Sequence, residues 1–273
     1  MWVTDEWADF ELWRLSTPTR YEQGNITMAG GAASGACARD ALRTGLELKR
    51  GIGENPYRFG FIGSTDGHGG ASAAEERQYI GKLGRIVGTN KGRDSVPRGP
   101  EDSEGASVLI EWSALGLAGV WPEHNTRQSI YAALRKKETF ATSGPRIKLR
   151  FLAGYQSTPE IIEGTDLIKR ACSCGVSKGV NLAVEPRKRP QFLVWAVREP
   201  TAGWLQRAQI AKGWVDYKKS REQVYDLACS DGLVPDRGTH RCPNSRAEVH
   251  LAACHASRDK GAMEVSPVDR SRF

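Results

Sequence analysis

The sequence lacks any long hydrophobic run and any basic, apolar leader at its start. Its longest strongly apolar stretch is Phe192 to Val197, far shorter than the ~20 residues that an apolar helix needs to cross a bilayer. The first ten residues are MWVTDEWADF, and their acidic side chains stand where a secretory signal has a basic start and an apolar core. We therefore expect no membrane span, and no export signal in the chain as written.

Histidine is scarce, and no two histidines form an H-x-H pair. The five are His68, His124, His240, His250 and His255. A catalytic metal ordinarily needs at least three protein ligands and an open position. The sequence therefore does not show a complete metal centre of the H-x-H type.

A concentrated basic patch is also missing, although the net charge is +7. The clusters Arg187-Lys188-Arg189 and Lys218-Lys219 are short and lack interleaved aromatic residues. A nucleic-acid interface usually gathers Lys and Arg on one face or along one helix. We therefore expect solvated loops at these clusters, and no nucleic-acid partner.

Two domains fit 273 residues better than one, because single cores seldom grow past ~250 residues. In residues 37–50 the side chains of Ala38, Leu42 and Leu46 recur every four residues before Gly51, which predicts an amphipathic helix that packs one face on a sheet. Residues 58–62 predict a strand. This order is typical of a βα-repeat domain, to which we assign residues 1–144.

A second helix is predicted from Thr126 to about Glu138. Asn125 is the expected N-cap, and Gln128 stands in the reciprocal capping position, as helix starts require. The expected buried face consists of Ile130, Tyr131 and Leu134. Between the two helices, Leu83 to Gly105 reads as a long surface loop.

Beyond residue 145 the apolar period becomes that of strands. Ile147, Leu149 and Phe151 alternate with charged residues, and Phe192 to Val197 is a compact apolar run. A further strand is predicted where Ala208, Ile210, Lys212 and Trp214 share one parity. Residues 145–262 are thus expected to form a β-rich domain, followed by a disordered tail at 263–273.

The chemically most suggestive segment is the loop Gly63 to Gly70, GSTDGHGG. Asp66 and His68 are two residues apart, so in an extended loop both side chains can reach one side of a strand end. Their carboxylate oxygen and imidazole nitrogen suit zinc, manganese or iron better than calcium. Taken alone, the same pattern also fits an Asp that caps a turn beside a surface His.

Five ordered segments of the chain form a recognisable pattern: Asp5–Trp13, Ala38–His68, Leu117–Phe151, Trp204–Asp216 and Val224–Gly232. In these segments the chain resembles a bacterial family, domain of unknown function 3604, which is related to the polymerase-and-histidinol-phosphatase (PHP) metallohydrolases. The resemblance spans most of the sequence.

This resemblance implies an α/β fold: the C-terminal part of a distorted βα barrel with a multinuclear metal centre, followed by the β-rich domain. The family's D-x-H pair at a late strand end maps onto Asp66 and His68, which are then metal ligands and catalytic residues. Its further ligands, including an early H-x-H, are expected upstream of Met1 or are absent.

Three further sets of residues leave alternatives open. Arg127 and Arg146 can bind an anionic substrate, because guanidinium matches phosphate or sulfate oxygens, or they simply solvate a helix and a strand face. His124 can approach the metal site, where the family usually has an acidic residue, but a surface role is the favoured interpretation. For Cys229, Cys242 and Cys254 we favour disulfides over a structural zinc site. The resemblance implies a further carboxyl-terminal cysteine and, with it, a periplasmic or extracellular location for intact family members.

Two functional hypotheses follow from these patterns. In the first, the protein is a metal-dependent hydrolase of small anionic esters of phosphate, sulfate or a related acid, with zinc, manganese or iron as cofactor. In the second, it is a truncated, non-catalytic remnant with a β-rich interaction domain. The substrate, the number of metals and the oligomeric state are not determined by the sequence.

Overall fold

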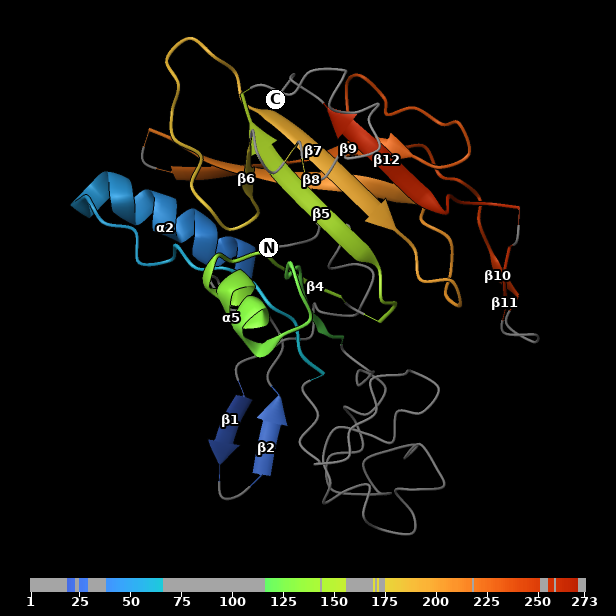
Figure 1. The fold of residues 1–273 in the computed structure, drawn as a ribbon, viewed down its shortest axis with the longest axis horizontal. Helices are drawn as coiled ribbons and strands as arrows, with labels where there is room; N and C mark the ends of the chain where they lie inside the picture. Colours follow the sequence, from blue (N-terminus) through green and yellow to red (C-terminus); the bar gives the residue numbers. More distant parts are fainter. Residues whose placement is uncertain are drawn as a thin grey trace. The chain divides into compact units, whose positions relative to one another are not determined.

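The computed structural model describes residues 19–22, 25–28, 38–65, 116–142, 144–155, 169, 171, 175–217, 219–250, 255–257 and 259–269. The chain divides into two compact units. One comprises Met1–Arg58, Thr65–Leu115 and Gly213–Arg221, and the other comprises Phe59–Ser64, Gly116–Lys212 and Glu222–Phe273. Figure 1 shows the helices and strands that the two units contain.

The first unit contains an antiparallel pair of strands, β1 (Thr19–Glu22) and β2 (Asn25–Met28), and the helix α2 (Ala38–Ile52). The helix confirms the amphipathic pattern of residues 37–50. It runs past the predicted stop, however, and ends at Gly53, which has a φ of 85° and donates its N–H to the carbonyl of Lys49 at 3.0 Å. Glycine takes this left-handed conformation without the strain of a Cβ.

Polar side chains join α2 to the tip of a long hairpin, residues 213–221, within the same unit. Glu47 Oε1 accepts a hydrogen bond from the backbone N–H of Ser220, and Arg50 donates to the carbonyl of Val215 at 3.3 Å. Leu42 and Leu46 each stay 37% exposed. The predicted apolar face is thus only partly covered, and Glu47 and Arg50 make hydrogen bonds between α2 and the hairpin tip.

The second unit is built on a four-stranded sheet with strand order β12-β7-β5-β6. Every pairing within it is antiparallel. Its strands are β5 (Lys148–Gly154), β6 (Gly175–Ser177), β7 (Gln191–Val197) and β12 (Glu264–Asp269). The strands predicted at Ile147–Phe151 and at Phe192–Val197 are thus confirmed as neighbours in one sheet.

A hairpin of β8 (Arg207–Asp216) and β9 (Lys219–Cys229) crosses the strands of this sheet (Figure 1). Its side chains Ala208 and Leu227 join Val194, Ala196 and others in the larger core cluster, to which Val265 of β12 also belongs. Leu227 is the most deeply buried large side chain, at 1% exposure. On the other face of the sheet, Leu152, Ala171 and Leu193 form a smaller cluster.

The remaining elements of the second unit are short. They are the pair β3 (Ala118–Val120) and β4 (Thr139–Ala141), the helix α5 (Arg127–Arg135), and the pair β10 (Val249–His250) and β11 (His255–Ala256). Helix α5 confirms the prediction of a helix from residue 126, but Tyr131 and Leu134 are 61% and 44% exposed, and Ala133 is the buried residue. The helix lies near β3, with Ala133 buried and the larger Tyr131 and Leu134 exposed.

Two expectations from the sequence do not hold in the structure. Residues 58–62 form no strand, since Phe59 and Ile62 stay 40% and 64% exposed and the carbonyl of Phe61 is bonded to a side chain. Glu264–Asp269, expected in a disordered tail, forms β12 and pairs with β7, because Val265 fits the core. The described residues form a mixed α/β structure with antiparallel sheets, and no barrel closes among them.

Candidate functional site

The backbone that leads into the loop Gly63 to Gly70 is held against β4. Thr139, only 7% exposed, donates its hydroxyl to the carbonyl of Phe61 at 2.7 Å. The rings of Phe59 and Phe61 meet edge to face at 5.2 Å. A buried hydroxyl that finds a carbonyl contributes on the order of 1 kcal/mol, so this contact helps to fix the chain just before the predicted ligands.

Gly63 fits against the β3–β4 pair because it has no side chain. An added Cβ would lie 3.0 Å from the Cβ of Ala141 and 3.2 Å from the carbonyl oxygen of Leu117. Such contacts are closer than ordinary van der Waals packing. This close packing holds the backbone at Gly63, three residues before Asp66. Functional loops are commonly carried on a fixed scaffold of this kind.

Asp66 and His68 themselves lie outside the described residues, so their role as metal ligands and catalytic residues stays a prediction. The loop predicted at Leu83 to Gly105 lies outside them too. Within the described ranges, no group of three or more His, Cys, Asp or Glu side chains could hold a metal ion. A metal centre with three protein ligands thus needs residues beyond those ranges.

Arg127 lies on the first turn of α5 and is exposed. The cap of this helix is Thr126, whose side chain accepts from the N–H of Ser129 at 3.3 Å, and not the predicted Asn125. His124 precedes it, also exposed, and donates its backbone N–H to the hydroxyl of Ser129. The exposure of His124 agrees with the surface role that we favoured.

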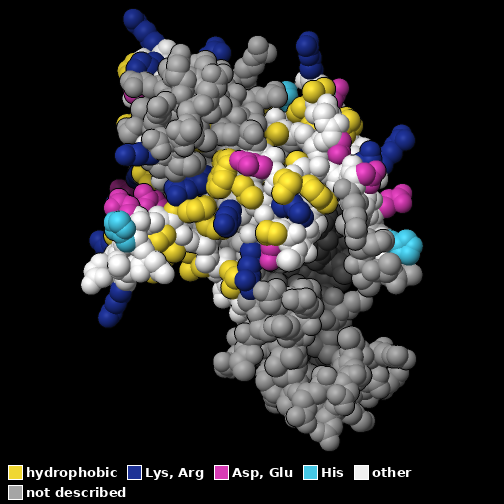
Figure 2. All heavy atoms as spheres, turned by 45° about the vertical axis from the view of Figure 1, so that its right-hand side comes forward, with side chains coloured by type: hydrophobic (Ala, Val, Ile, Leu, Met, Phe, Trp, Pro, Cys, Tyr) yellow, Lys and Arg dark blue, Asp and Glu magenta, His cyan; other side chains and the backbone are white. Residues whose placement is uncertain are grey.

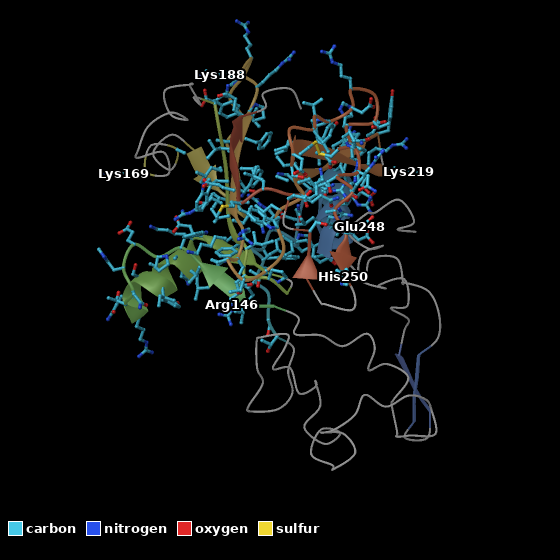
Figure 3. All side chains as sticks on the ribbon, turned by 90° about the vertical axis from the view of Figure 1, so that its right-hand side faces the viewer. Arg146, Lys169, Lys188, Lys219, Glu248 and His250 are labelled. Carbon is cyan, nitrogen blue, oxygen red and sulfur yellow. A yellow bond between two sulfur atoms is a disulfide. The ribbon has the colours of Figure 1, made fainter. Side chains whose placement is uncertain are left out.

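Arg146 lies just before β5 and is exposed, and its backbone N–H donates to Glu199 Oε2 at 2.8 Å. Figure 3 shows Arg146 and Lys188 at opposite ends of the strands that lie between them in the second unit. In the described structure, no hydrogen bond or ion pair joins Arg127 to Arg146. On the face drawn in Figure 2, basic side chains project singly between apolar and acidic ones.

A cluster of cations and aromatic rings, not foreseen from the sequence, lies where β3, β5 and β6 meet. The guanidinium of Arg150 sits 4.0 Å from the ring centroid of Trp121, which stacks on Phe140 at 5.4 Å. The ammonium of Lys178 lies 6.0 Å from the ring of Phe61. Burial lowers the pKa of Lys178, since a low-dielectric setting disfavours the charged form.

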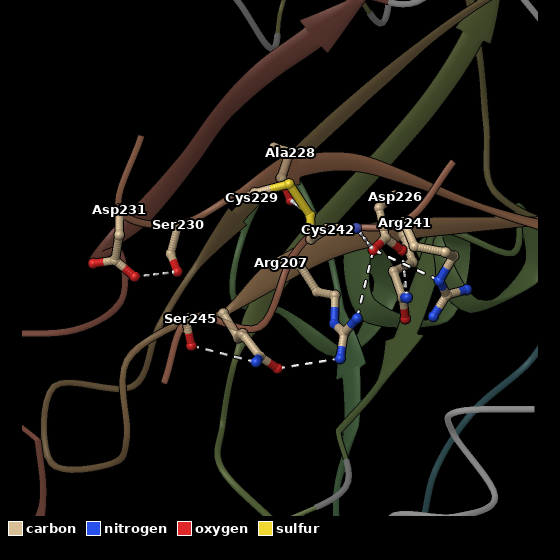
Figure 4. The surroundings of a disulfide bond; sticks show 11 residues. Arg207, Asp226, Ala228, Cys229, Ser230, Asp231, Arg241, Cys242 and Ser245 are labelled. Atoms are coloured by element: carbon tan, nitrogen blue, oxygen red, sulfur yellow. Dashed lines mark hydrogen bonds and ion pairs between the residues drawn. A yellow bond between two sulfur atoms is a disulfide. The ribbon is translucent and has the colours of Figure 1, made fainter. Parts of the chain in front are cut away.

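A second unforeseen feature is the buried carboxylate of Asp226, whose side chain is fully shielded from solvent. Its two oxygens accept hydrogen bonds of 2.6 Å from Gln209 Nε2 and from the backbone N–H of Cys242 (Figure 4). Arg207 and Arg241 lie 3.5 and 3.8 Å away. These partners satisfy the charge, so the group serves structure rather than catalysis.

The disulfide Cys229–Cys242 closes the loop that brings Arg241 and the Cys242 N–H to Asp226. It confirms the preference for disulfides among the three late cysteines, and Cys254 lies outside the described residues. Nearby, hydrogen bonds from Ser230 and the Gly261 N–H lower the pKa of Asp231, and Thr239 and the Gly238 N–H do the same for Asp236. The backbone N–H groups of Gly261, Gly238 and Thr239 donate to these carboxylates and stabilise the loops near the disulfide.

The chain belongs to the family described as "Protein of unknown function (DUF3604)", whose match covers residues 1–269. The family resemblance seen in the sequence is thereby confirmed. No curated protein and no solved structure matches the chain. Among the described residues, no helix has the length and apolar character to cross a membrane.

Proposed function

We propose that the protein is a metal-dependent hydrolase of the PHP type, which acts on phosphate, sulfate or related esters. Asp66 and His68 are the proposed metal ligands, and zinc, manganese or iron fits their oxygen and nitrogen donors. A bound ion of this kind lowers the pKa of a coordinated water to ~7 and so supplies hydroxide at neutral pH.

The observation that carries the proposal is that contacts with the β3–β4 pair hold the backbone where the loop begins. The Thr139 hydroxyl and the close fit of Gly63 fix the backbone up to three residues before Asp66. A loop that starts from a fixed backbone can hold ligands in a constant geometry, and binding loops are commonly positioned by a rigid scaffold. The relationship to PHP enzymes, and the correspondence to the later part of their barrel, belong to the same proposal.

Arg127 and Arg146 are the proposed contacts for the anionic group of the ester. Both are exposed and thus accessible to a solute, and their guanidinium groups match phosphate or sulfate oxygens in a bidentate way. In the hydrolase, Asp66 also serves as a proton acceptor and His68 as a ligand.

The test is metal binding by the purified chain. After dialysis against a chelator, the protein is titrated with Mn²⁺ or Zn²⁺, and the bound metal and the hydrolysis of chromogenic phosphate and sulfate esters are measured. The D66A/H68A variant should lose at least about tenfold in metal affinity, since a lost ligand or its partner typically costs this much or more. The matched control is D259A/H250A, whose native side chains are exposed.

Equal metal binding by the wild type, D66A/H68A and the control would refute the ligand assignment. Metal binding that depends on Asp66 and His68, without ester hydrolysis, would support the second candidate, a non-catalytic interaction protein.

A further inference from the structure

One face of the four-stranded sheet is filled at one end and hollow at the other. At the filled end, Val194 and Ala196 of β7 pack in the larger core cluster with the β8–β9 hairpin. Phe192 shares the parity of these two residues and stands opposite Ala153 of β5. At this other end the face opens into a cavity of about 360 Å³.

The cavity lies between the sheet and the loop that joins β6 to β7. Phe151, Ala153 and Phe192 line it from the strands, and Val180, Leu182 and Pro190 line it from the loop. Its volume falls within the range of ~300–1,000 Å³ that is usual for small-molecule sites. A lining of this kind, mostly apolar with few polar groups, suits one small organic molecule better than a polar solute.

Two phenylalanine rings that stack on each other line the cavity. The rings of Phe151 and Phe192 lie 5.8 Å apart between centroids and are nearly parallel, at 3°. The register pairs Phe151 with Val194 and Ala153 with Phe192, so the two rings are diagonal neighbours on one face. A flat apolar surface favours stacking with another ring.

Lys178 supplies the one cationic side chain of the lining. It follows β6, and its backbone N–H donates to the carbonyl of Phe151 at 3.1 Å, which fixes where the side chain starts. Within the described structure, its ammonium has no hydrogen-bond or ion-pair partner and faces the Phe61 ring. A part-buried charge without a counter-charge is costly, and an incoming anion offsets that cost.

We propose that this cavity binds a small aromatic anion, with its ring against Phe151 and Phe192 and its anionic group at Lys178 Nζ. The smaller hollow beside it, which Lys178 shares, is lined by Lys137 and Arg150 as well as Glu138, so the surroundings are basic on balance. The site shares no residue with the Asp66–His68 loop and goes beyond the proposed hydrolase activity. The two proposals can therefore fail separately.

The test compares two ligands that differ only in charge, naphthalene-2-carboxylate and naphthalene-2-carboxamide. Each is titrated into the full chain by calorimetry, without added metal. The carboxylate should bind with one molecule per chain and about tenfold more tightly than the amide, as expected for one hydrogen bond to a charged group. Lys178→Met should remove this preference by weakening the carboxylate about tenfold, with the amide unchanged.

Lys148→Met is the matched control, because Lys148 is exposed on β5 and does not line the cavity. Phe192→Ala should weaken both ligands alike, since both use the same aromatic wall. Circular dichroism and urea midpoints establish that each variant is folded. The proposal is overturned if neither ligand binds at millimolar concentration, if the two bind equally to the wild type, or if Lys178→Met behaves as Lys148→Met does.

Discussion

One face of the four-stranded sheet carries apolar residues at both ends, but one end is packed against the β8–β9 hairpin and the other borders a cavity. At the filled end, Ala208 and Leu227 of the hairpin cover Val194 and Ala196. At the hollow end, Phe192 is equally apolar, and it borders the cavity together with Phe151, which also packs against the core cluster; the loop between β6 and β7 lines the other side. An alternating strand therefore specifies which residues share a face, and the covering element decides whether that face becomes core or cavity.

The largest effect is expected from Asp226→Ala, which disrupts the covering hairpin from its outer face. The buried carboxylate accepts hydrogen bonds from Gln209 and the Cys242 N–H and lies near two arginines. Its removal leaves the two donors without an acceptor and the arginines without a counter-charge. The free energy of unfolding should fall by ~3–5 kcal/mol, measured by urea denaturation. Asp216→Ala, on the same hairpin but exposed, should change it by less than ~0.5 kcal/mol. A loss for Asp226→Ala no larger than this would contradict the buried network.

The second prediction compares the two ends directly through Leu227→Ala and Phe192→Ala. Leu227 is 1% exposed, so its truncation leaves a closed void and should cost ~2–5 kcal/mol. Phe192 borders an existing cavity, and its truncation enlarges that space instead of creating a new void. It should cost clearly less in the same urea experiment. Equal losses at the two positions would mean that both ends are filled.

The third prediction concerns the disulfide Cys229–Cys242, which follows strand β9 of the covering hairpin. Cys229 and Cys242 are 13 residues apart, and a loop of about this size contributes ~3 kcal/mol by restricting the unfolded chain. Reduction with dithiothreitol should lower the urea midpoint of the wild type accordingly. The C229A/C242A variant should begin at the lower midpoint and show no response to the reductant. A wild-type midpoint that does not move on reduction would exclude a stabilising role.

The smallest effect is expected from Lys178→Met at the hollow end. Burial lowers the pKa of Lys178 in the folded state, so the unfolded chain binds the proton more readily and wild-type stability rises with pH between the folded pKa and the unfolded value of ~10.4. Below that window the variant should be at least as stable as the wild type, and the difference should vanish above it. Urea midpoints of both proteins at several pH values measure this. A variant that is less stable at neutral pH would indicate a counter-charge at Lys178.

Strands were predictable where the apolar period was regular. The alternation at Ile147 to Phe151 and the run Phe192 to Val197 predicted β5 and β7 with ends within three residues of those observed. The segment 58–62 failed although its composition favours a strand: it forms no strand in the described structure, and the hydroxyl of Thr139 donates to the carbonyl of Phe61. Strand formation thus depended on a partner that composition does not reveal.

Helix ends depended on local chemistry that more than one residue could supply. Gly53 ends α2 where Gly51 was expected, and Thr126 caps α5 where Asn125 was expected. In both cases the expected residue is also of a suitable type and lies only one or two positions away, which is the usual uncertainty of helix ends. The exposed Tyr131 and Leu134 likewise show that spacing predicts a helix face without showing what meets it.

The candidate sites divide in the same way. Asp66 and His68 were predicted from residue type, spacing and the family resemblance, and their role as ligands stays a prediction. The cavity at Lys178 could not be found from sequence, because it needs Phe151, Lys178 and Phe192 from three separate segments. The buried Asp226 was equally hidden, since an aspartate in a strand pattern usually faces solvent.

By itself, the sequence determined the family, the strand-rich later part, the two described helices and a disulfide among the late cysteines, because these follow from motifs and short-range periodicity. Only the tertiary structure decided that β12 joins the sheet, that Asp226 is buried among arginines, and that one end of a sheet face stays open beside Lys178. The physical reason is that a side chain is buried only when a second segment covers it. The residues next to it in the sequence do not specify which distant segment will remove it from water.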